Sequence, residues 1–253
     1  MNSNSEDSEI VIGIDEAGRG PLAGPVAIGA VQLDPEKDFD ELKDSKKLSA
    51  KKRTELDLYI REHALYTDVR FVDHEMIDEL NIKQATIFGM EEIIKSIKPT
   101  PVKVIIDGNE KLNVSVNYES IVNGDQTEKP IMAAAIIAKV ARDKFMLEID
   151  EEFPEYGFRN HKGYGTKEHL NALKINGPCK YHRRSFKPVK EAELNNLENL
   201  EFRRAARELL ERYDDRTIKS RLEASEDNEE YLNNVRKALR EEWLYIKKAS
   251  SKR

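Results

Sequence analysis

Short apolar runs alternate with longer stretches of mixed character between residues 10 and 176. β-Branched side chains dominate the run at residues 10–14, which is typical of a strand rather than of a buried helix, and residues 66–72 alternate as a strand does. We predict five strands, at residues 10–14, 26–33, 66–72, 102–106 and 118–122. The second strand follows the first closely enough to pair with it in an antiparallel arrangement.

Three longer stretches predict helices. Residues 49–64 are rich in charge and begin with Ser49, a residue type favoured at helix N-caps. Apolar side chains recur at helical spacing in residues 81–97, and residues 130–149 combine such a stripe with consecutive alanines that permit close packing. Strands and helices in this order predict an α/β fold, with a mixed central sheet flanked by helices.

The pattern changes near Val189. Residues 190–253 hold 15 basic and 15 acidic side chains, with apolar residues at helical intervals and no glycine or proline. We predict a charged helical extension made of two amphipathic helices that are joined near residues 223–229. The chain therefore divides into a polar N-terminus at 1–9, expected to be disordered, one α/β domain at 10–189 and this extension.

Composition narrows the class of protein. The 253 residues are 39% apolar and 36% charged, and the formal net charge is −6. This balance argues against nucleic-acid binding through bulk positive charge but leaves room for a local basic surface. Cys179 is the only cysteine, so no disulfide can form within the chain. The acidic start and the lack of a long apolar run predict a cytoplasmic protein with no membrane partner, which we expect to be a monomer.

Three of the predicted strands lead into acidic residues. Asp15 and Glu16 follow the first strand, Asp107 follows the fourth, and Asp125 comes after the fifth. If these strands are neighbours, the carboxylates converge at one edge of the sheet, where open α/β sheets bind ligands. Clustered carboxylates repel each other unless hard cations such as Mg²⁺ or Mn²⁺ lie among them, and two such cations would support phosphodiester hydrolysis. The alternative, ordinary solvated strand ends, stays open on this pattern alone.

Basic and aromatic residues are concentrated at 158–190. This stretch contains nine lysines and arginines and a single acid, Glu168, with Tyr164, Tyr181 and Phe186 among them. Basic side chains contact phosphates, and aromatic rings stack on sugars or bases, so the stretch favours nucleic-acid binding. The alternatives are a solvated basic face and, for its histidines, hydrogen-bonded structural positions.

Six sequence blocks resemble those of the type 2 ribonuclease H family, ribonuclease HII, in its bacterial form. They are GIDEAGRGPLAGPV from Gly13, DSKKLS from Asp44, VIIDGN from Val104, GDQTEKPIMAAAIIAKVARD from Gly124, HKGYGTKEHL from His161 and HRRSFKPV from His182. The resemblance covers residues 11–189, and the presence of all six blocks in order makes it specific. It implies a ribonuclease-H-like α/β fold with a catalytic domain at residues 10–189, whose C-terminal part is helical and binds substrate.

The resemblance also implies an activity and a set of residues. The family cuts RNA in RNA–DNA hybrids and at single ribonucleotides in duplex DNA, so we expect a metal-dependent endoribonuclease that uses Mg²⁺ or Mn²⁺. The implied catalytic and metal-binding acids are Asp15, Glu16, Asp107 and Asp125. The implied substrate-binding residues are Gly18, Arg19, Gly20, Lys46, Lys47, Lys139, Tyr164 and Arg184. In the family, the Gly-Arg-Gly backbone binds the 2′-hydroxyl that distinguishes RNA from DNA, and the tyrosine stacks on a sugar.

Two features depart from the family pattern. Ala135 stands where the family usually has serine, which removes a hydroxyl near the substrate or in the helix packing. Residues 190–253 extend beyond the usual family end, and no partner is assigned to them. Two other functions therefore stay open: a two-metal nuclease of the same fold that acts on plain DNA, and a hybrid-binding module with weak catalysis. Cleavage assays on duplexes with and without ribonucleotides would separate these alternatives.

Overall fold

Five strands form one mixed sheet in this computed structural model, which describes residues 11–42, 49–223, 225, 229 and 232–239. The strands are β1 (Val11–Ala17), β2 (Val26–Gln32), β3 (Tyr66–Val72), β4 (Lys103–Asp107) and β5 (Tyr118–Ile121), in the spatial order β3-β2-β1-β4-β5. β2 is antiparallel to both β1 and β3, whereas β4 is parallel to both β1 and β5. The predicted mixed sheet is confirmed.

Strand β1 is longer than the apolar run that predicts it. Its pairing with β4 ends at Ile14, but its antiparallel pairing with β2 continues as far as Ala17. The hydrogen bonds of that second ladder keep the backbone extended after the last isoleucine. Asp15 and Glu16 are therefore inside the strand, where its pairing with β4 has ended and its pairing with β2 continues.

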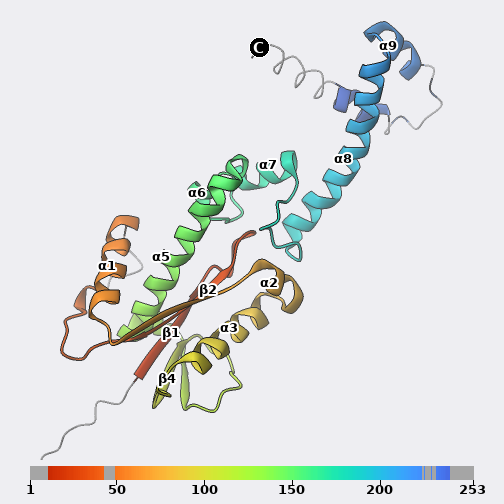
Figure 1. Ribbon diagram of the computed structural model, residues 1–253. Helices are drawn as coiled ribbons and strands as arrows, with labels where there is room; N and C mark the ends of the chain where they lie inside the picture. Colours follow the sequence, from red (N-terminus) through yellow and green to blue (C-terminus); the bar gives the residue numbers. More distant parts are fainter. Residues whose placement is uncertain (1–10, 43–48, 224, 226–228, 230–231, 240–253) are drawn as a thin grey trace, which may run out of the picture.

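Helices cover both faces of the sheet (Figure 1). The three predicted helices are present as α1 (Ala50–His63), α3 (Ile82–Ser96) and α5 (Lys129–Glu152). α5 lies across β1 and β2 beside α1, and α3 covers β2 and β3 from the other side. The apolar core on the α3 side includes Ile12 and Ile14 of β1, and the core on the α1 side is built largely from α5.

Two strand glycines allow α5 to rest directly on the sheet. A Cβ atom on Gly13 would lie 2.2 Å from the carbonyl carbon of Pro130. A Cβ atom on Gly29 would lie 2.3 Å from the carbonyl oxygen of Ala134. Both distances are far below van der Waals contact, so the close approach of helix and sheet depends on the missing side chains.

Several short helices are absent from the sequence prediction. They are α2 (His74–Leu80), α4 (Gly124–Thr127), the 3₁₀ turn η2 (Pro154–Tyr156), α6 (Phe158–His161) and α7 (Lys167–Asn176). Helices of fewer than about three turns contain too few apolar positions to form a recognisable stripe, and they depend on caps and tertiary packing. α2, for example, begins where the Asp73 side chain accepts a hydrogen bond of 2.8 Å from the Met76 N–H.

The charged extension is helical but has one more break than predicted. α8 (Lys187–Arg212) runs through the proposed boundary at residue 189 and leads away from the sheet (Figure 1). α9 (Asp215–Glu223) follows after a break at which Asp214 Oδ1 accepts a hydrogen bond of 2.8 Å from the Thr217 N–H. Residues 232–239 are helical as well. The domain boundaries stay a prediction, and the expected disordered N-terminus and most of the expected linker lie outside the described residues.

No helix in the described part of the chain is long and apolar enough to cross a membrane.

Candidate active site

The sheet brings the ends of β1 and β4 together. Ile14 of β1 pairs with Ile106 of β4 in parallel register, and Asp15 and Asp107 each follow their paired residue at the same edge of the sheet. Asp125 comes from the first turn of α4, and its backbone N–H lies 3.4 Å from Asp107 Oδ1. The elements that carry the predicted acids therefore meet at one place.

The electrostatics of this edge are unfavourable without a positive partner. Asp15 is only 6% exposed. Burial raises the pKa of Asp15 well above its usual range, and repulsion from Glu16, Asp107 and Asp125 adds to the effect. Burial also raises the pKa of Glu16, although the charge and hydrogen bond of Arg19 act in the opposite direction. The acids are thus close enough to repel each other in a poorly solvated place.

The donor set fits a hard divalent cation by its chemistry. All the candidate ligands are carboxylate oxygens, which Mg²⁺ and Mn²⁺ prefer, and a cation would relieve the repulsion around Asp15. Across the described residues, no three acidic, histidine or cysteine side chains are already arranged around a common metal position. The fit therefore rests on donor type and charge, not on a preformed cage.

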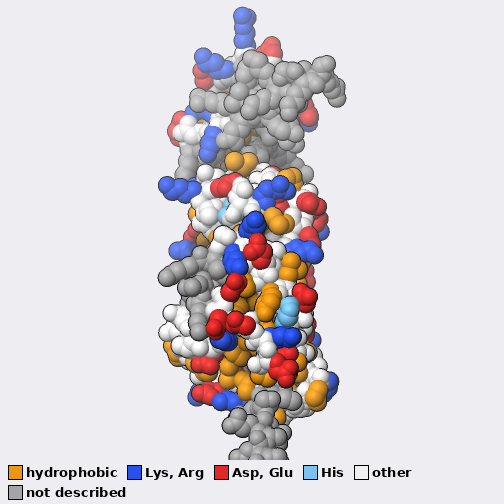
Figure 2. Space-filling model, turned by 90° about the vertical axis from the view of Figure 1, so that its left-hand side faces the viewer, with side chains coloured by type: hydrophobic (Ala, Val, Ile, Leu, Met, Phe, Trp, Pro, Cys, Tyr) orange, Lys and Arg blue, Asp and Glu red, His pale blue; other side chains and the backbone are white. Residues whose placement is uncertain are grey.

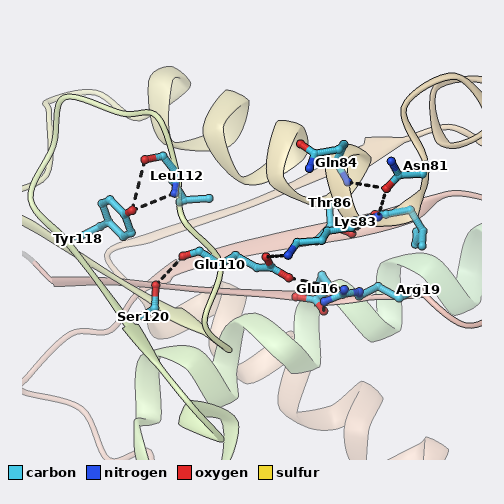
Figure 3. A network of polar contacts seen from close by, with 11 residues as sticks. Glu16, Arg19, Asn81, Lys83, Gln84, Thr86, Glu110, Leu112, Tyr118 and Ser120 are labelled. Atoms are coloured by element: carbon cyan, nitrogen blue, oxygen red, sulfur yellow. Dashed lines mark hydrogen bonds and ion pairs between the residues drawn. The ribbon is translucent and has the colours of Figure 1, made fainter.

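Glu16 belongs to a chain of ion pairs that joins the β1–β2 loop to α3 (Figure 3). Arg19 Nη1 lies 3.3 Å from Glu16 Oε1, and Arg19 Nη2 lies 3.6 Å from Glu110 Oε1. The second oxygen of Glu110 lies 3.3 Å from Lys83 Nζ. Asn81 fixes the start of α3 by accepting hydrogen bonds from the next turn, including the Lys83 N–H at 3.0 Å. Arg19 is thus held between two acids.

A second part of the site forms around Tyr164, which is 44% exposed. The Leu22 N–H donates a 2.7 Å hydrogen bond to the carbonyl of Gly163, so the β1–β2 loop is joined to the turn that carries Tyr164. A Cβ atom on Gly20 would lie 3.6 Å from Tyr164 Cε1. Lys139 Nζ lies 5.9 Å from the centre of the tyrosine ring. The structure therefore brings three of the predicted substrate-binding residues together.

Much of the basic stretch is occupied by local contacts. Arg184 donates its backbone N–H to Asp78 Oδ2 at 2.7 Å, and its guanidinium pairs with Glu193. Lys180 pairs with Glu152 at 2.6 Å. On the face shown in Figure 2, basic and acidic side chains are interspersed rather than separated. Arg184 thus has acidic neighbours of its own, and Lys46 and Lys47 lie outside the described residues.

The three histidines of the stretch are buried and hydrogen-bonded, as the structural alternative predicts. His161 Nε2 lies 2.9 Å from the Tyr156 carbonyl oxygen, and His169 Nδ1 lies 3.0 Å from the Tyr164 carbonyl oxygen. His182 Nε2 contacts His169 Nε2 at 2.9 Å. These contacts support the turn that carries Tyr164.

Three charged residues around the site are missing from the sequence prediction: Glu110, Arg142 and Arg183. All three are buried. Glu110 comes three residues after Asp107, and both arginines lie inside sequence blocks that resemble the family. A single sequence does not distinguish a buried arginine from an exposed one, so only their membership of those blocks could have pointed to them.

Comparison with known proteins agrees with the fold and with these blocks. A family model described as Ribonuclease HII matches residues 12–189. The ribonuclease HII of Burkholderia pseudomallei (strain 668) is 50% identical over 184 residues, covering 73% of this chain and 86% of that protein. The ribonuclease H2 structure from Pyrococcus horikoshii OT3 has a TM-score of 0.63 and 25% identity, covering 73% of this chain and 97% of its own. A chain of the PCNA:RNase HII complex from Archaeoglobus fulgidus has a TM-score of 0.60 and 28% identity, covering 70% of this chain and 95% of its own.

Proposed function

Because this chain belongs to the ribonuclease HII family, we propose that it hydrolyses the phosphodiester 5′ to a ribonucleotide with the help of divalent cations. Family membership makes the chain a ribonuclease H, an endonuclease that acts on RNA–DNA hybrids. We extend this activity to single ribonucleotides embedded in duplex DNA. The products would carry 5′-phosphates, and the cation would be Mg²⁺ or Mn²⁺.

The meeting of the β1 and β4 ends is the observation that supports this chemistry. Asp15 and Asp107 lie on parallel neighbouring strands, and Asp125 approaches Asp107 from α4. Together with Glu16 they would hold the cations. Bound there, two cations supply an activated water and a stabilised leaving oxygen for in-line hydrolysis.

The residues beside the acids would position the ribonucleotide. Backbone groups of Gly18, Arg19 and Gly20 are next to Glu16 in the chain and would bind the 2′-hydroxyl, because only RNA carries that group. Tyr164 would stack on a neighbouring sugar, and its exposed ring is free to do so. Lys139, beside that ring, would contact a phosphate.

Further phosphate contacts are proposed for Arg184, Lys46 and Lys47. Arg184 would have to exchange its contact with Glu193 for a phosphate oxygen, an exchange that charge-assisted bonding permits. We assign no partner to the helical extension, and we propose that the protein acts as a cytoplasmic monomer.

Asp107→Asn tests the function. An amide is a poor ligand for a hard cation, so we expect the variant to fold normally and to lose at least about 100-fold in cleavage rate, equivalent to about 3 kcal/mol of transition-state stabilisation. Binding of the duplex should survive better than cleavage, because the phosphate contacts come from other residues. The matched control is Glu148→Gln, which changes an exposed acid on α5.

Each variant should be assayed on three duplexes of one sequence that carry no, one or many ribonucleotides, with Mg²⁺ or Mn²⁺. Near-normal cleavage by a folded Asp107→Asn protein would refute the four-carboxylate site. Efficient cutting of the all-DNA duplex by the wild type would instead favour a nuclease without ribonucleotide specificity. Binding of the hybrid without any cleavage would favour the binding-module alternative.

A further inference from the structure

Two fully buried arginines hold the loop between β1 and β2. Arg142 of α5 and Arg183, shortly before α8, are both 0% exposed. The Arg183 guanidinium donates five hydrogen bonds to backbone carbonyls of the loop: to Gly18 at 2.7 Å, Arg19 at 3.0 Å, Pro21 at 2.8 Å, Gly24 at 2.9 Å and Pro25 at 3.1 Å. A guanidinium has five N–H groups, so every donor of Arg183 is used on this loop.

Arg142 connects the same loop to the turn that carries Tyr164. Its guanidinium donates to the carbonyls of Ala23 at 3.1 Å and Pro25 at 2.9 Å in the loop. It also donates to the carbonyl of Lys162 at 3.0 Å, two residues before the tyrosine. Arg142 therefore sets the distance between the two backbone segments to which the proposed function assigns ribonucleotide contacts.

Backbone carbonyls, not carboxylates, accept the hydrogen bonds of these two arginines, although the charges of Asp143 and Asp78 also favour the charged forms of Arg142 and Arg183. In the described part of the chain, neither guanidinium lies within ion-pair distance of an acid. Burial lowers the pKa of Arg142 to about 10 and the pKa of Arg183 to about 9, and both side chains stay charged at neutral pH. Burying two charges without an ion pair is costly unless hydrogen bonds replace the lost hydration, and here the loop carbonyls supply those hydrogen bonds.

The hydrogen bonds of Arg183 have a geometric consequence for the other side of the loop. Because the carbonyls of Gly18 and Arg19 are turned inward, the peptide groups present their N–H side elsewhere. Among the described residues, the N–H groups of Arg19 and Gly20 donate no hydrogen bond, and both residues are exposed. Gly18 itself has φ of +103°, and a Cβ atom there would lie 2.0 Å from Arg142 Nε. The loop therefore fits the arginines only with glycine at this position.

We propose that Arg183 and Arg142 are positioning residues for ribonucleotide recognition: they hold the loop carbonyls inward and leave the N–H groups of Arg19 and Gly20 exposed for substrate oxygen. This role rests on the function proposed above and places the two arginines behind the backbone that would contact the substrate. The two arginines do not touch the substrate. Their effect is to fix the spacing and orientation of the groups that do.

Arg183→Lys and Arg142→Lys test this role. Lysine keeps the charge but cannot replace the planar fork of donors. We expect folded variants whose kcat at a single ribonucleotide falls about 10- to 100-fold, the loss typical of contacts displaced by about 1 Å. Affinity for an all-DNA duplex of the same sequence should stay within about twofold, because phosphate contacts come from other side chains. Arg61→Lys, which alters an arginine of α1 that pairs with Asp57, is the matched control.

The wild-type assay distinguishes failure of the proposed function from failure of the positioning role. If wild-type protein does not prefer the ribonucleotide duplex, the proposed function fails. If it does, and folded Arg183→Lys and Arg142→Lys keep wild-type kcat, the positioning role is wrong. Loss of thermal stability with unchanged kcat in the folded protein would show that the arginines are merely structural.

A measurement on the unaltered chain keeps the inference testable if both lysine variants fail to fold. With ¹⁵N-labelled arginine and glycine, the Arg19 and Gly20 amides should exchange rapidly with solvent in the free protein. They should become protected when a ribonucleotide duplex is added without divalent cation, and the matched DNA duplex should have a smaller effect. Amides that are already protected in the free protein, or that respond equally to both duplexes, would overturn the proposal.

Discussion

Acidification from pH 7 to pH 5 should destabilise this protein through His169 and His182, two neutral histidines in its interior. The Nδ1 atom of His169 faces the carbonyl of Tyr164 at 3.0 Å and must carry the proton, since a carbonyl only accepts. The other nitrogen of a neutral ring is then an acceptor, so His182 donates from Nε2 across the 2.9 Å contact. His182 Nδ1 in turn accepts from the Cys179 N–H at 2.9 Å. A further proton on either ring would place two donors face to face.

The pKa values agree with this hydrogen-bond pattern. The pKa of His169 is lowered to about 4, mainly by burial and to a smaller extent by the neighbouring His161. Burial lowers the pKa of His182 to about 3, with smaller contributions in the same direction from His169 and Arg184. The hydrogen bond from the His169 ring to the Tyr164 carbonyl acts in the opposite direction but does not compensate.

The sign and size of the effect follow from proton linkage. An unfolded chain binds protons on both histidines below a pKa of about 6.5, while the folded protein stays neutral there. Stability is therefore complete above pH 6.5 and falls by about 1.4 kcal/mol per pH unit and histidine below it. At pH 5 the loss is about 2 kcal/mol for each ring and about 4 kcal/mol for the pair. The size of this stability loss depends on the histidine pKa in the unfolded chain, because the pKa values in the folded protein lie at or below about 4.

Urea unfolding of wild type, His169→Gln and His182→Gln at pH 7, 6 and 5 measures this loss. Glutamine can form hydrogen bonds but does not titrate, so each variant should be less stable than wild type at pH 7. The stability gap should narrow by about 2 kcal/mol between pH 7 and pH 5, because only the wild type loses that histidine's contribution. Comparing wild type with variant cancels the titration of the carboxylates. A gap that stays constant over this range would refute the neutral, buried assignment.

Two further predictions address recognition and fold. Tyr164→Ala should remove a stacking contact of about 1–3 kcal/mol and weaken cleavage at an isolated ribonucleotide more than cleavage of a long hybrid, where neighbouring positions can substitute. Equal losses on both substrates at one fixed salt concentration would exclude Tyr164 from recognising single ribonucleotides. Gly13→Ala should lower the free energy of unfolding by about 3 kcal/mol, because the new methyl group meets the helix backbone at 2.2 Å and neither side can yield. Gly20→Ala, whose methyl group has room, should change stability by less than about 0.5 kcal/mol, and a similar effect for both alanines would contradict the close packing of α5.

The sheet and its long helices could be predicted from the sequence because their signals are local. The alternating pattern at residues 66–72 matches β3 at both ends, and Ser49 caps α1 by accepting a hydrogen bond from the Lys52 N–H. The end of β1 could not be predicted in the same way. Whether the strand stops at Ile14 or continues to Ala17 depends on its neighbours, and pairing with β2 is a tertiary property.

The charge of a side chain is also visible in the sequence, but its environment is not. The stretch at 158–190 predicts a basic surface, yet Arg183 is completely buried. Arg184, its neighbour in the chain, is exposed and pairs with Glu193. Both carry the same charge, and adjacent positions in a turn can face opposite ways. Arg183 differs from Arg184 because it donates hydrogen bonds to carbonyls of a segment about 160 residues earlier in the chain. The sequence alone does not reveal that contact.

Strand β1 and the loop that follows it carry residues for both the proposed hydrolysis and the proposed recognition of the ribonucleotide. Its last residues contribute Asp15 and Glu16, and the loop that follows carries the Gly-Arg-Gly backbone. That loop is fixed at three points from the C-terminal part of the domain: Leu22 bonds to Gly163, Gly24 bonds to Tyr181, and Ala23 forms a bridge with His182. A shift of this C-terminal part would therefore move the loop relative to the acids. Coupling of this kind would let contacts with the sugar control the position of the reacting phosphodiester, as the proposed cleavage beside a ribonucleotide requires.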